Sequence, residues 1–207
     1  MKLILLILFS SLLFSASLEE GVLAYRDGNY TKALKTFEVL AKNDNADAQY
    51  NLGVMYLYAK GVEPDTKKAY KWFLKSAENN NTIAQYMVGY MLENGMGVKQ
   101  DLKKAFQFYE KASKNQHAKA LYSVGTFYER GDIVKKDLDK AKELYKKAAA
   151  KGSVAAAFKI GKLLEQENEI DQAIQWYKAL IKINYIPAKE ALEALCKTNR
   201  QYCEEKQ

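Results

Sequence analysis

Residues 84–119 read AQYMVGYMLENGMGVKQDLKKAFQFYEKASKNQHAK, and this stretch returns along the chain at a spacing of 36 residues. Glycine, alanine and aspartate recur in fixed columns. A constant period of this length is typical of stacked helical repeats, in which one repeat cannot bury its apolar face without a neighbour. The columns are Gly53, Gly89, Gly125 and Gly161; Ala48, Ala84, Ala120 and Ala156; Ala33, Ala69, Ala105 and Ala141; and Asp65, Asp101 and Asp137.

Residues 84–93 are expected to form the first helix of a repeat, because their apolar side chains fall in one stripe on a helical wheel. Gly89 lies beside that stripe, although glycine costs a helix about 1 kcal/mol relative to alanine. Four glycines at one helical position predict a steric reason. We expect another helix backbone to pass too close for a Cβ, with the small Ala105 of the second helix as partner.

The second helix of this repeat is expected to begin at Asp101. An aspartate before Leu-Lys-Lys-Ala can accept hydrogen bonds from the first turn, and its charge suits the positive end of the helix dipole. Asp65 and Asp137 repeat the signal. Between the two helices, residues 94–98 (NGMGV) are typical of a turn.

The remaining sequence extends the array in both directions. Residues 18–47 resemble a shortened repeat with a tight turn, and after residue 155 the spacing falls from 36 to 32. Pro187 is expected in the first turn of a final helix, where proline is tolerated. We expect five helix pairs and a capping helix, with repeats near 18–47, 48–83, 84–119, 120–155 and 156–186 and a cap at 187–207.

These columns carry a family resemblance. The pattern Ala-x4-Gly, then Gly-x-Gly-Val-x3-Asp-x3-Ala, then an aromatic residue and Lys-Ala resembles the Sel-one-like repeat, a relative of the tetratricopeptide repeat. Residues 48–155 carry three such units, with Ala59 and Ile133 in place of loop glycines. The resemblance implies an all-α fold, a right-handed α-solenoid, with adaptor or scaffold roles.

In tetratricopeptide-like stacks the first helices line the concave side, so the resemblance implies an aromatic groove here. Tyrosine offers an apolar face with a hydroxyl at its edge, which suits protein or peptide partners. The alternative is that these rings pack between neighbouring repeats, and both remain open. The predicted partner-binding residues are Tyr50, Val54, Tyr86, Tyr90, Tyr122, Thr126 and Phe158.

Residues 1–17 are expected to be a signal peptide. Lys2 precedes an apolar run from Leu3 to Phe14, which ends in small residues suited to cleavage. The run is shorter than the roughly 20 residues that cross a bilayer as a helix. We expect export to the periplasm or the medium without a stable membrane span once residues 1–17 are removed; an uncleaved anchor is the alternative.

Charge gives a weaker indication. The chain has 32 basic and 25 acidic residues, a net charge of +7, which could favour an acidic surface or partner. The lysines are spread along the array as pairs, such as Lys67-Lys68 and Lys103-Lys104, and do not form one block. This spread is typical of a solvated face, so we expect no nucleic-acid partner. The sequence predicts no oligomeric state.

Two cysteines, Cys196 and Cys203, lie near the end of the chain. In one unbroken helix they would be about 10.5 Å apart along the axis, too far for a disulfide, which needs Cα atoms within about 7 Å. Asn199 is expected to stop the helix in a left-handed conformation, so that the chain folds back. In an oxidising compartment outside the cytoplasm we expect a Cys196–Cys203 disulfide.

No set of residues predicts catalysis, a metal or a cofactor. His117 is the single histidine, and it is expected at the surface. Glu93, Glu129 and Glu165 share a column one repeat apart, as solvated positions do. A cysteine-rich branch of the resembled family is described as penicillin-binding or weakly β-lactamase-like, which gives a hydrolase alternative. That alternative is disfavoured, because the chain has only the terminal cysteine pair and no Ser-x-x-Lys follows Ser76, Ser113, Ser123 or Ser153.

Overall fold

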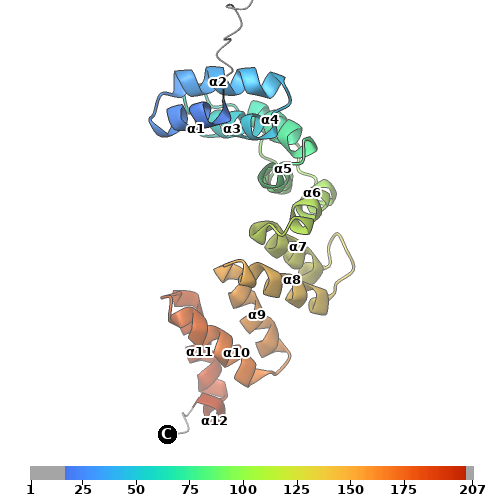
Figure 1. The fold of residues 1–207 in the computed structure, drawn as a ribbon. Coiled ribbons are helices and arrows are strands. Elements are labelled where there is room, and N and C mark those ends of the chain that lie inside the picture. The colour runs from blue at the N-terminus through green and yellow to red at the C-terminus, as the bar shows by residue number, and fades with distance from the viewer. Residues whose placement is uncertain (1–16, 204–207) are drawn as a thin grey trace, which may run out of the picture. The chain divides into compact units, whose positions relative to one another are not determined.

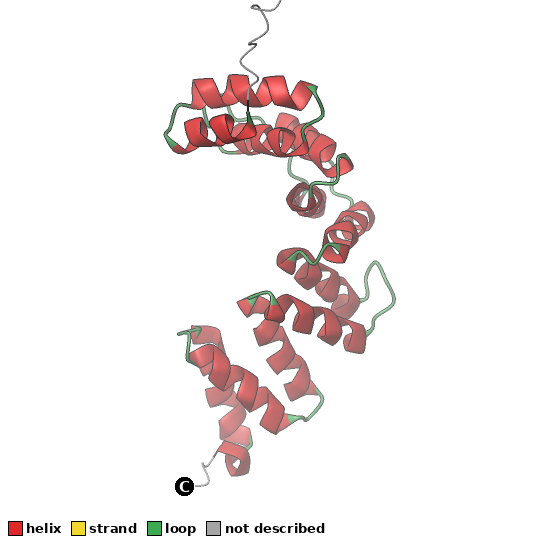
Figure 2. Cartoon of the chain, viewed as in Figure 1, coloured by secondary structure: helices red, strands yellow, loops and turns green. Residues whose placement is uncertain are grey.

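The computed structural model describes residues 17–203, and all regular structure in that range is helical, with short connecting turns (Figure 1, Figure 2). The expected all-α fold class is confirmed. Residues 1–16, which hold nearly all of the predicted signal peptide, lie outside the described range. The helices are α1 (Leu18–Arg26), α2 (Tyr30–Lys42), α3 (Ala46–Leu57), α4 (Thr66–Glu78), α5 (Thr82–Asn94), α6 (Leu102–Lys114), α7 (Ala118–Arg130), α8 (Leu138–Ala150), α9 (Val154–Gln166), α10 (Ile170–Ile181), α11 (Ile186–Thr198) and α12 (Arg200–Cys203).

The helices fall into two compact units, which divide between Gln100 and Asp101. In the N-terminal unit, each helix from α1 to α5 packs against the next one along the chain. The same holds in the C-terminal unit from α6 to α11, with the short α12 against α11. Packing between successive helices is the arrangement that a repeat array requires.

The glycines that recur within the first helices have a different steric cause from the expected one. A Cβ on Gly53 would lie 2.6 Å from the ring of Phe73, and one on Gly125 would lie 2.7 Å from the ring of Tyr145. Gly161 lies in the same way against Tyr177. The glycines therefore make room for a buried aromatic ring of the second helix. We expected the backbone of the second helix to approach each glycine at a small alanine, and this expectation was wrong at these positions. Gly21 has the same contact with Phe37 and extends the column to the first repeat.

The helix starts follow two columns of capping residues. Asp65, Asp101 and Asp137 each accept a hydrogen bond from the backbone N–H three residues later at 2.9 Å, as expected. The first helices have a second column, which the sequence reading missed. It consists of Asn45, Asn81, His117 and Ser153, and each side chain accepts a hydrogen bond from the N–H three residues later. Capping thus fixes both helices of a repeat at their N-termini.

The two residues that replace loop glycines, Ala59 and Ile133, differ in backbone conformation. Gly95 ends α5 in the left-handed region, at φ 68°. Ala59, which replaces the equivalent glycine, keeps the left-handed backbone at φ 53° despite its Cβ. Ile133 replaces the second loop glycine, and it does not take a left-handed conformation. The turn between α7 and α8 therefore follows a different path, since only a residue that tolerates positive φ can preserve the original one.

The expected cap at 187–207 contains helices α11 and α12, and residues 204–207 lie outside the described range. Pro187 lies in the first turn of α11, and Leu195 is buried. Asn199 ends the helix, but at φ −129°, so the predicted left-handed conformation was wrong. The Cys203 side chain lies outside the described part, and the Cys196–Cys203 disulfide stays a prediction.

Candidate functional site

The candidate site is the face of the first helices α3, α5, α7 and α9 that carries the predicted partner-binding residues. On α3, Tyr50 is half-buried, and its ring packs against Phe73 with 5.6 Å between centroids. Burial raises the pKa of Tyr50, and the nearby hydroxyls of Tyr58 and Tyr25 raise it further. Val54, one turn along, is partly buried. The Tyr50 ring therefore packs partly against the second helix of its own hairpin.

Helix α5 presents the more open aromatic surface. Tyr86 and Tyr90 lie one turn apart with stacked rings, 6.5 Å between centroids. Tyr90 is 40% exposed, and Ile83, on the same side of the helix, is 47% exposed. Burial raises the pKa of Tyr86, with smaller contributions from Tyr90 and Glu93. We call Ile83, Tyr86 and Tyr90 the α5 aromatic face.

The corresponding rings of the C-terminal unit are more engaged in packing. Tyr122 lies 5.5 Å from the Tyr145 ring, and Phe158 lies between Tyr177 at 5.8 Å and Tyr185 at 5.6 Å. The hydroxyl of Thr126 donates to a backbone carbonyl of its own helix. In this unit the alternative of packed rings describes much of the aromatic surface.

Two tyrosine–glutamate pairs, which were not predicted from the sequence, lie beside these rings. The Tyr145 hydroxyl donates to Glu129 at 2.5 Å, and the Tyr177 hydroxyl donates to Glu165 at 2.9 Å. Burial first, and then the hydrogen bond to the carboxylate, raises the pKa of each tyrosine. The expectation that these glutamates are simply solvated was wrong. Each one stands four residues after the glycine that the ring covers, which is a signal the sequence does contain.

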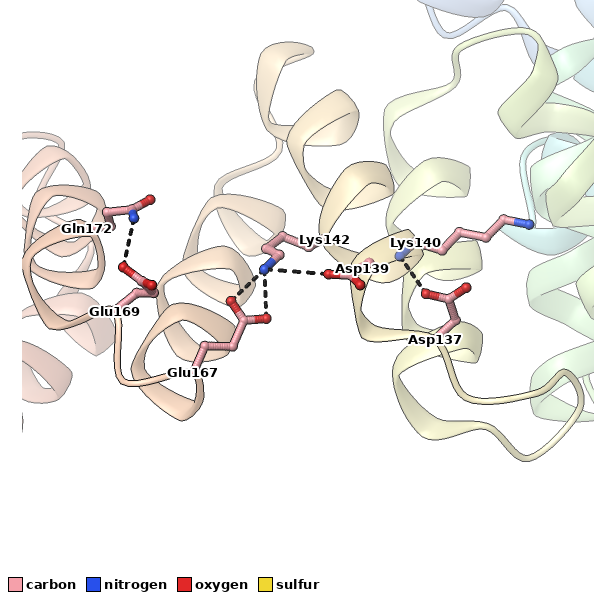
Figure 3. Close-up of polar contacts among 7 residues, drawn as sticks. All are labelled: Asp137, Asp139, Lys140, Lys142, Glu167, Glu169 and Gln172. Atoms are coloured by element: carbon pink, nitrogen blue, oxygen red, sulfur yellow. Dashed lines mark hydrogen bonds and ion pairs between the residues drawn. The ribbon is translucent and has the colours of Figure 1, made fainter.

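Lysines complete the polar surface of the C-terminal unit. Lys159 forms an ion pair with Glu129 at 3.0 Å, and Lys162 forms one with Glu165 at 2.9 Å. On another edge, Lys142 of α8 contacts Glu167 beyond the end of α9 at 2.5 Å and Asp139 at 3.9 Å (Figure 3). Lys159 and Glu129 join α9 to α7, and Lys142 and Glu167 join α8 to the end of α9. Lys162 and Glu165 pair within α9.

The residues weighed for chemistry have structural roles. His117 is half-buried, not freely exposed, and its Nδ1 accepts from the Ala120 N–H at 3.3 Å. Ser76 donates to the Ala46 carbonyl, and Ser113 donates to a carbonyl of its own helix. Within residues 17–203, no group of three metal-ligating side chains is gathered. Nor does any described helix have the length and apolar character to cross a membrane.

Comparison with known families agrees with the period of the columns. The model of the Sel1 repeat matches residues 46–81, 82–117, 118–153 and 154–182, which is more than half of the chain. The chain belongs to the Sel1 repeat family. A tetratricopeptide repeat model matches residues 18–61, in agreement with the tighter first hairpin. Sel1 repeats form scaffolds, and a protein-binding role is consistent with them.

Solved structures show the same fold. A Sel1 repeat protein from Oxalobacter formigenes is 30% identical, with a TM-score of 0.78 over 85% of this chain and 74% of its own. The protein c5321, a protective antigen of uropathogenic Escherichia coli with an SLR fold, is 25% identical, with a TM-score of 0.80 over 87% of this chain and 40% of its own.

A curated relative matches over one repeat. The ERAD-associated E3 ubiquitin-protein ligase component HRD3B of Arabidopsis thaliana is 49% identical over 39 residues. The match covers 19% of this chain and 6% of the length of that protein. The likeness is therefore one of the Sel1 repeat itself.

Proposed function

We propose that this Sel1 repeat protein is an exported, non-catalytic scaffold that binds a protein, a peptide or a component of the cell envelope along its first helices. The observation that carries the proposal is the α5 aromatic face. Tyr90 and Ile83 are exposed, and the half-buried Tyr86 ring stacks on Tyr90. Aliphatic and cationic groups of a partner can pack against this surface.

Two further features support a binding role over catalysis. Ser76, Ser113, Ser153 and the histidine are used in helix caps and backbone hydrogen bonds. On α1, α3, α7 and α9 a ring of the second helix packs over the glycine, and a well-packed surface loses less entropy when a partner binds. Export is proposed from the character of residues 1–17, and a relative described as a protective antigen is consistent with it.

Capture experiments with single variants test the binding surface. The full chain is immobilised, and partners from the exported fraction are crosslinked and eluted. Tyr90→Ala and Tyr86→Ala are expected to lower capture about tenfold or more, as loss of a central aromatic contact does, with little change in melting temperature. Val39→Ala is the control, since Val39 is 46% exposed on the second helix α2 and should leave capture unchanged.

Tyr122→Ala separates binding from packing in the C-terminal unit. Because Tyr122 contacts the buried Tyr145 ring, this variant is expected to lower the melting temperature more than Tyr90→Ala does. Full capture by Tyr86→Ala and Tyr90→Ala proteins would refute the proposed surface.

Export and the absence of catalysis are tested separately. Fractionation into cytoplasm, periplasm and medium, with the mass of the mature N-terminus, tests export and cleavage. Incubation with a chromogenic β-lactam beside a heat-killed control tests the hydrolase alternative, and turnover above that control would overturn the non-catalytic assignment.

A further inference from the structure

Two asparagines stand in a sequence that can accept a glycan. Asn29-Tyr30-Thr31 and Asn80-Asn81-Thr82 both match Asn-x-Thr, the acceptor for N-linked glycosylation outside the cytoplasm. Among the 12 asparagines of the chain, only these two have serine or threonine two positions later. Both also have an acidic residue two positions earlier, namely Asp27 and Glu78. The two segments therefore share the longer pattern acidic-x-Asn-x-Thr.

The structure places both segments in exposed turns of the N-terminal unit (Figure 1). Asn29 is exposed in the turn between α1 and α2, with Asp27 and Thr31 exposed on either side. Asn80 is exposed in the turn between α4 and α5, where its left-handed backbone, φ 64°, marks the tip of the turn. A modifying enzyme reaches turns of this kind more easily than the faces of packed helices.

We infer that Asn29 and Asn80 are acceptor sites for an N-oligosaccharyltransferase whose acceptor extends to the acidic residue two positions before the asparagine. The co-substrate is an oligosaccharide joined to a lipid through a pyrophosphate. The inference rests on the export part of the proposed function, because transfer of this kind takes place outside the cytoplasm.

The transfer uses one nitrogen of the side-chain amide. Nδ2 forms a bond to the anomeric carbon of the sugar, and the bond from that carbon to the pyrophosphate oxygen breaks. The lipid pyrophosphate leaves with the bonding electrons, and Nδ2 gives up one of its two protons to a base of the enzyme. The side-chain oxygen takes no part in the bond that forms.

The fold can keep its contacts after this transfer. The Oδ1 atom of Asn29 accepts from the Lys32 N–H at 3.1 Å and caps α2. Because the glycan joins Nδ2, this cap survives. Asn80 uses its backbone N–H in the turn, bonded to the Ala77 carbonyl at 3.1 Å, so its exposed side chain can carry a glycan without loss of that bond.

The chain contains its own negative controls. Asn168 and Asn184 are also exposed in turns, at φ 62° and 59°, but each is followed two positions later by isoleucine. They match Asn80 in backbone and exposure and lack the hydroxyl at the second position. A modification that depends on exposure alone would reach them as well.

Peptide mapping by mass spectrometry tests the inference. The full chain is produced in a bacterial host that carries the lipid-pyrophosphate oligosaccharide and an N-oligosaccharyltransferase of the stated acceptor class. We expect one glycan at Asn29, one at Asn80 and none at Asn168 or Asn184. Thr31→Ala should remove the first glycan alone, and Thr82→Ala the second alone. Thr82→Ala introduces the residue that already begins α3 and α7, so this variant is expected to fold.

Further variants separate the acceptor from folding and export. Thr31→Ser should keep the glycan, whereas Asp27→Ala should lose it at Asn29; a glycan retained in Asp27→Ala overturns the acidic requirement. A second version of the full chain carries an added, established signal sequence. Glycans on that version alone support the sites and refute export by residues 1–17. An exported protein that is unmodified at both asparagines overturns the inference.

Discussion

In the N-terminal unit the ring over a first-helix glycine is Phe73, whereas in the C-terminal unit the equivalent rings are Tyr145 and Tyr177. The residue four positions after the glycine changes with the ring. It is Tyr25 in the hairpin of Phe37, Leu57 in the hairpin of Phe73, and a glutamate, Glu129 or Glu165, hydrogen-bonded to the tyrosine in the other two. The ring packs over the glycine in every case. The tyrosine hydroxyl and the glutamate carboxylate that accepts its hydrogen bond occur together. In these hairpins, the glutamate on the first helix therefore occurs together with the tyrosine on the second helix.

The polar side-chain links between helices are of two kinds, amide hydrogen bonds and ion pairs. In the N-terminal unit, Asn79 donates to Gln49 at 2.9 Å and Asn81 donates to Asp47 at 2.8 Å. In the C-terminal unit, an ion pair joins Lys142 of α8 to Glu167 after α9. An ion pair also joins successive helices of the N-terminal unit, between Lys32 of α2 and Glu20 of α1. Side-chain amides lose little strength in salt, whereas exposed ion pairs are screened. The Lys142–Glu167 link should therefore weaken with ionic strength more than the Asn79–Gln49 link does.

The largest expected effect tests the feature that the two units share. Gly53→Val and Gly125→Val each place a branched side chain against a buried ring, and each should cost about 3 kcal/mol of unfolding free energy. Urea denaturation followed by circular dichroism measures this loss. If only one variant is destabilised, the packing is not equivalent in the two units.

Alanine at the same positions provides the control. Gly53→Ala and Gly125→Ala gain about 1 kcal/mol of helix propensity, which offsets part of the steric cost. Their loss should be smaller than that of the valine variants. Equal losses would show that the ring contact is not the cause.

The next effect concerns the polar pair. Glu129→Leu leaves the hydroxyl of the fully buried Tyr145 without its acceptor, and it should cost about 2 kcal/mol. The double variant Glu129→Leu with Tyr145→Phe recreates the Leu57–Phe73 pair and should recover most of that loss. A double-mutant cycle measured by denaturation gives the coupling. Additive losses would mean that the two residues do not act as a pair.

A smaller, pH-dependent effect is expected at the caps of the first helices. His117 takes the place that Asn45 and Asn81 hold in the N-terminal unit, and only its neutral form can accept from Ala120. Burial, and then the charge of Lys119, lowers the pKa of His117 below its ordinary 6.5. Above that value the histidine is neutral in both the folded and the unfolded chain, and its contribution to stability is complete.

As pH falls through 6.5, the unfolded chain binds a proton more readily than the folded one, so stability is lost. The loss should not exceed about 1 kcal/mol, the usual contribution of an N-cap. Melting temperatures at pH 7.5 and 5.5 measure it. His117→Asn should remove this part of the pH dependence, and an unchanged profile would contradict the cap assignment.

The smallest effect concerns the ion pair of Figure 3. Lys142→Ala should cost about 0.5 kcal/mol at low salt and less at high salt. Asn79→Ala is the matched variant of the N-terminal unit, and its loss should be independent of salt. Thermal melts in 0.02 M and 1 M sodium chloride compare the two. A salt-independent loss in Lys142→Ala would contradict the expected difference between the two links.

Most of the fold could be predicted from periodicity alone. The columns of glycine and aspartate fixed the helix pairs and the second-helix caps, because a cap depends on local sequence. The partner of each glycine could not be predicted in the same way. Both Ala105-type residues and aromatic residues recur at the repeat spacing, and only the three-dimensional packing shows that the ring lies over the glycine.

The candidate site was predicted less completely. The column from Tyr50 to Phe158 lies on the first helices, and its role in binding stays a prediction. The exposure of each ring depends on the neighbouring ring, which a column does not reveal. Tyr90 is exposed to solvent, and its stacking partner, Tyr86, lies on the same helix. The His117 cap was missed because histidine is an uncommon N-cap residue.

The tyrosine–glutamate pair also determines where this array can be cut and recombined. Glu129 and Tyr145 are 16 residues apart, on the first and second helices of one hairpin. Exchange of repeats at the cap positions 81, 117 or 153 moves both residues together. Exchange at Asp65 or Asp137 separates them, and it can leave a buried hydroxyl facing leucine. Libraries of shuffled repeats should therefore be joined in the turns that precede the first helices.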